Sequence, residues 1–340
     1  MRAANVGYTV REARSSDRPQ VLDLLQRSLA GGPTGERSEE FFRWKHELNP
    51  FGTSFSLVAE EDGRLIGFRT FLRWRFRAGE RTVEAVRAVD TATHPDHQRR
   101  GIFTRLTLSA LDALGGRADL VFNTPNERSL PGYLKMGWRR VGTVPVAIRP
   151  VRPIRFARGI RQAVRGAPSG PPPPCPVPPA SETLDDTSAV EQLLSEATPT
   201  HARLTTDRSL EYLRWRYVMP PDLDYRGVAL WSGSRLDGLA LGRPRRRGRL
   251  AEFVLGEVLV RPGDTSSARR LLRAVTRAGS DHIAAHLDGG GTLRRAGLAT
   301  GYLSLPRVGM TLTCRPLTDI TLDPMQLGSW DLSLGDLEVF

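Results

Sequence analysis

The stretch His94–Thr104 reads HPDHQRRGIFT and separates two segments of different periodicity. Residues 82–93 before it favour one long strand, and after it apolar residues recur at helical spacing. A polar loop that ends where a helix begins presents unsatisfied backbone N–H groups at the positive end of the helix dipole. Gly101 lacks a side chain that would block a phosphate, and Arg99 and Arg100 add positive charge. The stretch therefore predicts a phosphate cradle.

The segments around this loop alternate between strand and helix patterns. Strands are expected over 8–12, 55–59, 65–72, 82–93, 120–123 and 141–148, and helices over 17–29, 39–46 and 103–114. Such an order predicts an α/β fold of the α+β kind, built on a mixed sheet.

The residues after the 120–123 strand indicate a family. The loop has neither G-x-x-x-x-G-K-S/T nor G-x-G-x-x-G, which disfavours nucleoside triphosphates and dinucleotides. Asn126–Trp138 reads NERSLPGYLKMGW, and together with the loop it resembles the GNAT superfamily of acyl-CoA-dependent N-acyltransferases. Phe103 departs from the family pattern, because a small residue is usual there. The positions that match the two family motifs are Gln98, Gly101, Asn126, Ser129, Tyr133, Lys135 and Gly137.

The resemblance implies an N-acetyltransferase that uses acetyl-CoA. No metal is expected, because neither the pair His94 and His97 nor the pair His282 and His286 encloses a Glu as in a zinc-protease helix. Tyr133 would protonate the departing thiolate as general acid, since a phenol is a suitable proton donor to sulfur. Asn126 would bind the pantetheine arm, and backbone groups at Ala92 and Thr93 would pair with its amides. The implied cofactor-binding set is Ala92, Thr93, Gln98, Arg99, Arg100, Gly101, Ile102, Phe103, Thr104, Asn126 and Ser129.

The attacking amine must also lose a proton, and three acceptors are open. Glu84 and Asp90 occupy even positions of the 82–93 strand, on one face unless a bulge intervenes. Water is the third acceptor.

An internal repeat divides the chain. The segment 40–46, EFFRWKH, matches 211–217, EYLRWRY, at an offset of 171 residues, so two copies of one domain are expected. The second copy has Thr265-Ser-Ser-Ala at the cradle and Leu293 at the position of Tyr133, and is therefore predicted to be a degenerate GNAT-like domain. The expected limits are a catalytic domain at 1–150, a Pro/Arg-rich linker at 151–181, the degenerate domain at 182–316 and a tail at 317–340.

Composition sets broad limits on location and partners. The 340 residues carry a formal charge of +12, which attracts phosphate-bearing ligands, but no zinc or helix-turn-helix motif favours specific nucleic-acid binding. No apolar stretch is long enough to span a membrane, no secretory signal is evident, and the two cysteines form no disulfide framework, so a cytoplasmic protein is expected. A tandem pair can bury its own interface, which favours a monomer.

The C-terminal tail alternates Leu332, Leu334 and Leu337 with acidic residues, which predicts a docked segment. By analogy with the enhanced-intracellular-survival acetyltransferases, Asp336, Glu338 or the Phe340 carboxylate is hypothesised to approach Tyr133; the alternative is plain packing.

The function expected from the sequence is acetyl transfer from acetyl-CoA to a primary amine of a small molecule, such as an amino sugar or an amine metabolite. The alternatives are a peptide or protein amine as acceptor, and a non-catalytic module that binds acyl-CoA or nucleic acid.

Overall fold

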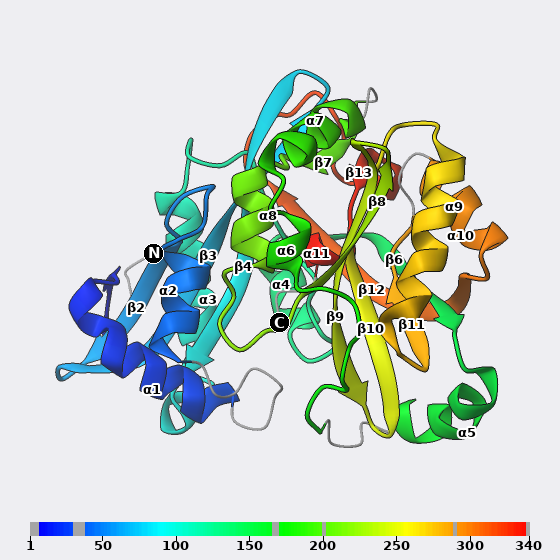
Figure 1. The fold of residues 1–340 in the computed structure, drawn as a ribbon. Helices are drawn as coiled ribbons and strands as arrows, with labels where there is room; N and C mark the ends of the chain where they lie inside the picture. The colour runs from blue at the N-terminus through cyan, green and yellow to red at the C-terminus, as the bar shows by residue number, and fades with distance from the viewer. Residues whose placement is uncertain (1–6, 30–37, 165–169, 199–201, 288–290, 338–340) are drawn as a thin grey trace.

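The computed structural model describes residues 7–29, 38–164, 170–198, 202–287 and 291–337. One mixed sheet runs through the described chain in the order β1-β2-β3-β4-β5-β12-β6-β11-β10-β9-β8, with β7 and β13 attached at the side (Figure 1). The predicted α/β fold with a mixed sheet is confirmed. The strands are β1 (Thr9–Glu12), β2 (Phe55–Glu61), β3 (Arg64–Ala78), β4 (Arg81–Thr93), β5 (Leu120–Asn123), β6 (Arg139–Pro150), β7 (Leu204–Thr206), β8 (Arg226–Ser232), β9 (Arg235–Arg247), β10 (Leu250–Val260), β11 (His282–Ala285), β12 (Leu303–Pro316) and β13 (Trp330–Asp331).

The helices lie on both faces of this sheet. In the N-terminal half, α1 packs Leu24 and Leu25 against Val58 and Phe68, whereas α3 packs on the opposite face, where Leu57 and Ala59 point. The helices are α1 (Arg18–Leu29), α2 (Glu39–His46), α3 (Ile102–Ala113), α4 (Leu130–Lys135), α5 (Pro153–Val164), α6 (Ala180–Thr183), α7 (Thr187–Ala197), α8 (Leu210–Tyr217), α9 (Thr265–Ala274), α10 (Thr292–Ala299) and α11 (Leu334–Leu337).

Strand pairing follows the same order in the two halves. In the first half β2, β3 and β4 are antiparallel neighbours and β4 pairs with β5 in parallel. In the second half β8, β9 and β10 are antiparallel neighbours and β10 pairs with β11 in parallel.

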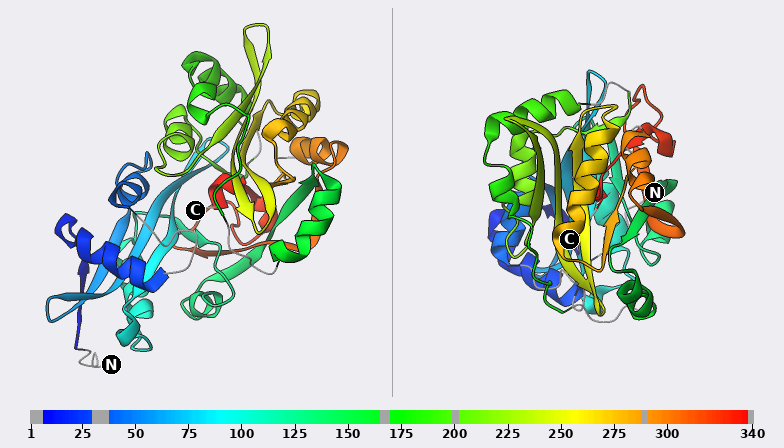
Figure 2. Two further views of the ribbon diagram at one scale, coloured as in Figure 1. Left: turned by 60° about the horizontal axis from the view of Figure 1, so that its bottom comes forward. Right: turned by 45° about the vertical axis from the view of Figure 1, so that its right-hand side comes forward.

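The halves exchange their last strands at the centre of the sheet. β12 from the second half lies between β5 and β6, and β6 from the first half lies between β12 and β11. Each half therefore completes the sheet of the other, and residue 150 separates two sequence segments that share one continuous sheet. The views of Figure 2 show the halves joined along these central strands.

The largest apolar cluster is shared by the two halves. It joins Trp44 and Trp74 of the first half to Tyr212 and Trp215 of the second, and Trp330 of the tail packs on it. No helix in the described ranges is both long and apolar enough to cross a membrane.

Candidate active site

Strand β4 leaves β5 partway along its length. The parallel ladder joins Ala85–Arg87 to Leu120–Phe122, and β4 then continues to Thr93. Backbone groups on the β5 side of this last stretch have no strand partner in the described chain, so an extended ligand arm can pair with them. Ala92 is buried and Thr93 half-buried there, and the Thr93 carbonyl accepts a hydrogen bond from Ser28 Oγ at 3.1 Å.

The predicted cradle forms the turn into α3. Gly101 adopts φ 74°, in the left-handed region that favours glycine, and no side chain caps the N–H groups of the helix that starts at Ile102. An anion placed there meets free donors and the positive end of the dipole. Ile102 is buried in the core, so only its backbone faces this position.

The other predicted loop residues differ in whether their side chains are exposed or bound by neighbouring residues. Gln98, Arg99 and Thr104 are exposed. Arg100 is bound by Glu61 through two hydrogen bonds of 2.5 and 3.0 Å, which lower the pKa of the Glu61 carboxyl. His97 contacts the same carboxylate at 2.9 Å. These contacts fasten the loop to the end of β2.

Tyr133 lies in α4 with its ring buried. Phe103, the second residue of α3, meets it edge to face at a centroid distance of 5.6 Å, and Trp138 packs on it at 5.2 Å. The Phe103 ring is half-buried between α3 and α4, which shows how the helix accommodates the larger residue. The cradle and Tyr133 are thus joined by a single ring contact.

The sequence analysis missed Arg69 of β3. Its Nη1 donates a hydrogen bond to the Tyr133 hydroxyl oxygen at 3.0 Å and another to the Thr91 hydroxyl, and the side chain is fully buried. A signal was present in the sequence, because Arg69 shares the phase of Gly67 and Phe71, which face the core, and is the one charged residue in the run 65–72.

Asp90 and Glu84 do not share one face of β4. Asp90 is the extra residue of a bulge, with φ 39°, between the pairs Thr70–Val89 and Arg69–Thr91. Its buried carboxylate accepts from Lys45 Nζ at 2.6 Å and contacts His46 Nε2 at 3.0 Å. A carboxylate held this tightly by a cation is a weak proton acceptor.

Glu84 lies far along the strand from this bulge. Six residues of extended chain separate it from Asp90, roughly 20 Å at about 3.3 Å per residue. Its half-exposed carboxylate bonds Arg75 Nε at 2.8 Å. The structure therefore places Glu84 near the start of the ladder with β5 and away from the cradle.

Asn126 and Ser129 shape the turn before α4. The Asn126 side-chain oxygen accepts from the backbone N–H groups of Arg128 (3.1 Å) and Ser129 (2.9 Å) and from the Ser129 hydroxyl. Both residues thereby position the helix that carries Tyr133, and a contact with the pantetheine arm stays a prediction.

The corresponding helix start in the second half is filled by the chain itself. Asp264 caps α9, and its carboxylate accepts from the Ser267 N–H at 2.9 Å. This carboxylate occupies the anion position that stays open at α3. Beside it, a cavity of about 340 Å³ is lined by His286 and by Leu293, the residue at the position of Tyr133.

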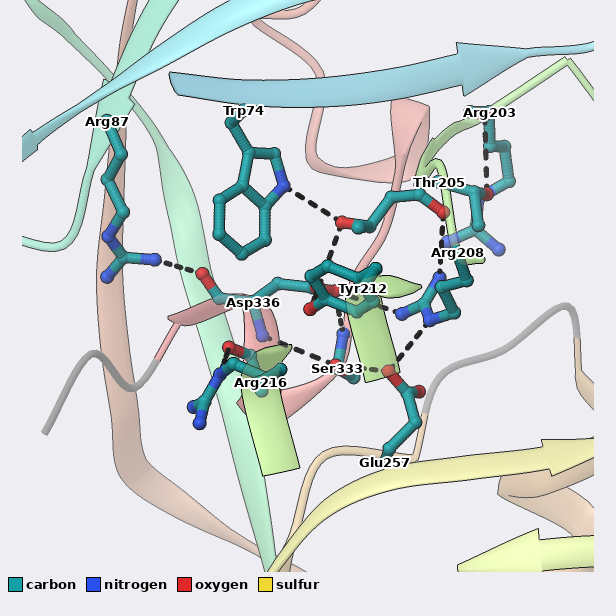
Figure 3. Close-up of polar contacts among 12 residues, drawn as sticks. Trp74, Arg87, Arg203, Thr205, Arg208, Tyr212, Arg216, Glu257, Ser333 and Asp336 are labelled. Atoms are coloured by element: carbon teal, nitrogen blue, oxygen red, sulfur yellow. Dashed lines mark hydrogen bonds and ion pairs between the residues drawn. The ribbon is translucent and has the colours of Figure 1, made fainter. Parts of the chain in front are cut away.

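The C-terminal tail docks between the halves (Figure 3). The Asp336 carboxylate accepts from Thr206 Oγ1 (2.9 Å), Arg208 Nη2 (3.1 Å) and the Ser333 N–H (2.7 Å). Arg87 of β4 donates to the carbonyl oxygens of Asp336 and Leu337. The bonds of Asp336 hold the tail in place and do not reach Tyr133; Glu338 and Phe340 lie outside the described residues.

Comparison with known protein families identifies a domain in the N-terminal half. Residues 9–141 match the family model described as acetyltransferase (GNAT) domain. This stretch contains the cradle and Tyr133, and the prediction that the chain is an N-acetyltransferase is confirmed at the level of this domain. No curated protein is similar in sequence to the chain.

Three solved structures resemble nearly the whole chain in fold. A GCN5-related N-acetyltransferase from Anabaena variabilis ATCC 29413 matches 92% of this chain and 73% of its own, at 12% identity and a TM-score of 0.63. A probable N-acyltransferase of unknown function from Enterococcus faecalis V583 matches 91% of this chain and 73% of its own, at 14% identity and a TM-score of 0.64. Eis1 from Mycobacterium abscessus matches 91% of this chain and 73% of its own, at 17% identity and a TM-score of 0.54. These likenesses concern the fold.

Proposed function

We propose that the N-terminal half transfers an acetyl group from acetyl-CoA to a primary amine of a small molecule, such as an amino sugar or an amine metabolite. The observation that carries the proposal is the open start of α3 beside Tyr133, joined by the Phe103 ring at 5.6 Å. A pyrophosphate on the N–H groups of α3 leaves the thioester arm to run along the unpaired stretch of β4.

The reaction is a direct attack. The amine nitrogen forms a bond to the thioester carbonyl carbon, the carbon–sulfur bond breaks, and the sulfur takes a proton from the Tyr133 hydroxyl. Of the three proton acceptors for the amine, water fits the placement best, because Asp90 is held by Lys45 and Glu84 lies at the other end of β4.

The chain end is a second candidate for assisting the amine. Arg87 binds the Leu337 carbonyl and, at 3.0 Å, the Thr124 hydroxyl just beyond β5, so the last described residue of the tail lies close to the turn that leads to Tyr133. Removing residues 338–340 leaves the Asp336 anchor intact. Unchanged transfer by this shortened protein would limit the tail to packing.

We further propose that the second half is a degenerate copy of the first, which supports the catalytic half without binding acetyl-CoA. Three observations support this proposal: the repeated strand order, the Asp264 carboxylate at the start of α9 and Leu293 at the position of Tyr133. The exchanged strands tie both copies into one sheet, as expected of a monomer.

The test is the mass gained by amines incubated with acetyl-CoA. The panel contains glucosamine, tyramine and a peptide with a free amino terminus, and thiol release is followed in parallel. Tyr133→Phe should bind acetyl-CoA as the unmodified protein does and transfer about 10²-fold more slowly. Tyr302→Phe, which alters another buried tyrosine in the second half, is the matched control. Binding without transfer to any amine would favour the non-catalytic acyl-CoA module.

A further inference from the structure

Arg69 is a buried cation that has no anionic partner in the part of the chain that the structure describes. Its side chain is fully buried, no carboxylate of the described residues forms an ion pair with it, and neither Nε nor Nη2 has a hydrogen-bond acceptor among them. Two other buried cations pair with carboxylates, Lys45 with Asp90 and Arg208 with Glu257 and Asp336. The buried Arg87 instead donates to the backbone carbonyl oxygens of Asp336 and Leu337. Apart from its hydrogen bonds to the Thr91 and Tyr133 hydroxyls, the Arg69 guanidinium contacts three aromatic rings, those of Phe71 (4.6 Å), Phe103 (5.6 Å) and Tyr133 (5.5 Å).

An unpaired buried charge is a liability for folding. Removing a guanidinium from water is costly, and contacts with aromatic rings offset only part of that cost. Packing alone would be served better by an apolar residue of similar length. The charge lies within hydrogen-bonding distance of the Tyr133 oxygen, which indicates that the cation acts on the phenol.

The direction of that hydrogen bond is fixed by chemistry. A guanidinium has donors and no acceptor, so the Tyr133 oxygen must accept from Arg69 Nη1. The hydroxyl proton of Tyr133 is then directed at another acceptor. The same Nη1 holds Thr91, the residue after the bulge in β4, and so ties the phenol to the strand beside which the thioester arm would run.

We infer that Arg69 is a positioning residue for acetyl transfer, and that its charge stabilises the phenolate left when Tyr133 protonates the leaving sulfur. The inference rests on the proposed function. When the carbon–sulfur bond breaks, its electron pair stays on sulfur, the Tyr133 proton moves to sulfur, and the negative charge appears on the phenol oxygen beside Arg69. Water that has taken the amine proton returns one to the phenolate, which closes the cycle.

The experiment is a double-mutant cycle of Arg69→Met and Tyr133→Phe, assayed with acetyl-CoA and the fastest amine of the panel, or with water as acceptor if no amine reacts. Arg69→Met should lower kcat about 10- to 100-fold, with the Kd for acetyl-CoA and the melting temperature kept or improved, because an unpaired buried charge is removed. In the Tyr133→Phe background the same substitution should change kcat less than about twofold, since both act on one proton. Arg69→Lys, which keeps the charge, should recover part of the loss.

The controls separate the possible failures. Arg149→Met removes an arginine that lies over Tyr302 at 5.6 Å in the second half and should leave kcat unchanged. Normal turnover by Arg69→Met, an equal loss in both backgrounds, or a fall in melting temperature that accounts for the loss would overturn the inference while leaving the proposed function intact. Normal turnover by Tyr133→Phe alone would overturn the role of Tyr133 as acid, and the role of Arg69 with it.

Discussion

Trp44 and Trp215 exchange hydrogen bonds across the junction of the two halves. Nε1 of Trp44 donates to the carbonyl oxygen of Trp215 at 2.6 Å, and Nε1 of Trp215 donates to the carbonyl oxygen of Trp44 at 2.9 Å. The indole rings stack with centroids 5.5 Å apart. The two residues hold equivalent places in α2 and α8, 171 residues apart, so one repeated contact fastens the two halves in a symmetric way.

Replacing either tryptophan should loosen this junction. Trp44→Phe or Trp215→Phe removes an indole donor that binds a buried carbonyl oxygen and should lower the free energy of unfolding by about 1–3 kcal/mol in urea denaturation. The double variant should lose less than the sum of the two, because the contacts are shared. Trp231→Phe, at a residue 39% exposed, is the control; an equal loss there, or strict additivity, would contradict a specific coupling.

Acetyl-CoA binding should depend on one helix start. Gly101→Glu strains a residue at φ 74° and adds a negative charge to the cradle, so calorimetry should detect no binding. Gly263→Glu makes the same change before α9, at φ 81°, and should leave binding at one site per chain. Two sites in the unmodified protein, or equal effects of both variants, would contradict a single open cradle.

The tail should detach when Gly335 gains a side chain. A Cβ there would clash with the Tyr217 hydroxyl and lie 3.1 Å from the Gly256 carbonyl oxygen, so Gly335→Ala should cost about 1–3 kcal/mol of stability and increase proteolysis of the C-terminus. Tyr217→Phe should relieve part of the cost by removing the hydroxyl. Gly328→Ala, with no atom within 4 Å, should be neutral; a comparable loss there would mean that the close approach is not the cause.

Glu257 should make stability fall as the pH rises. Burial raises its pKa to about 7 against the attraction of Arg208, and the nearby Asp336 adds to the rise. Between the unfolded value of 4.5 and about 7 the folded protein holds a proton that the unfolded chain has lost, so this contribution to stability decreases across that range.

The comparison with Glu257→Gln isolates the effect. The stability difference between the unmodified protein and this variant should shrink by up to about 3 kcal/mol from pH 4.5 to 7.5. Glu252→Gln is the opposite case: although burial opposes it, the hydrogen bond from His282 and the charge of Arg245 lower the pKa of Glu252 to about 2. The stability that the Glu252 carboxylate contributes should diminish as the pH falls below 4.5, the direction opposite to that of Glu257. A flat profile for Glu257→Gln would contradict the prediction.

Much of the fold was readable from local patterns. The helix and strand periods predicted the elements of the first half, with β3 extending past the expected residue 72 to Ala78 because Trp74 and Phe76 continue its buried face. The cradle and the Tyr133 segment were found because each is a contiguous motif whose geometry depends on a few neighbouring residues. The constant offset between 40–46 and 211–217 indicated a repeat, and the Trp44–Trp215 contact is its physical counterpart.

Tertiary structure alone decided how distant segments meet. The exchange of β6 and β12 depends on pairing between residues more than 150 positions apart, which no local period encodes. The bulge at Asp90 turned a carboxylate away from the face that simple alternation assigns to it and placed it against Lys45. Arg69 meets Tyr133 because packing of α4 on the sheet brings residues 64 positions apart within 3.0 Å. The sequence by itself thus determined the two motifs that resemble a GNAT domain and the local cap of α9 by Asp264. The charge beneath the phenol comes from long-range packing, where the free energy of many contacts selects one arrangement.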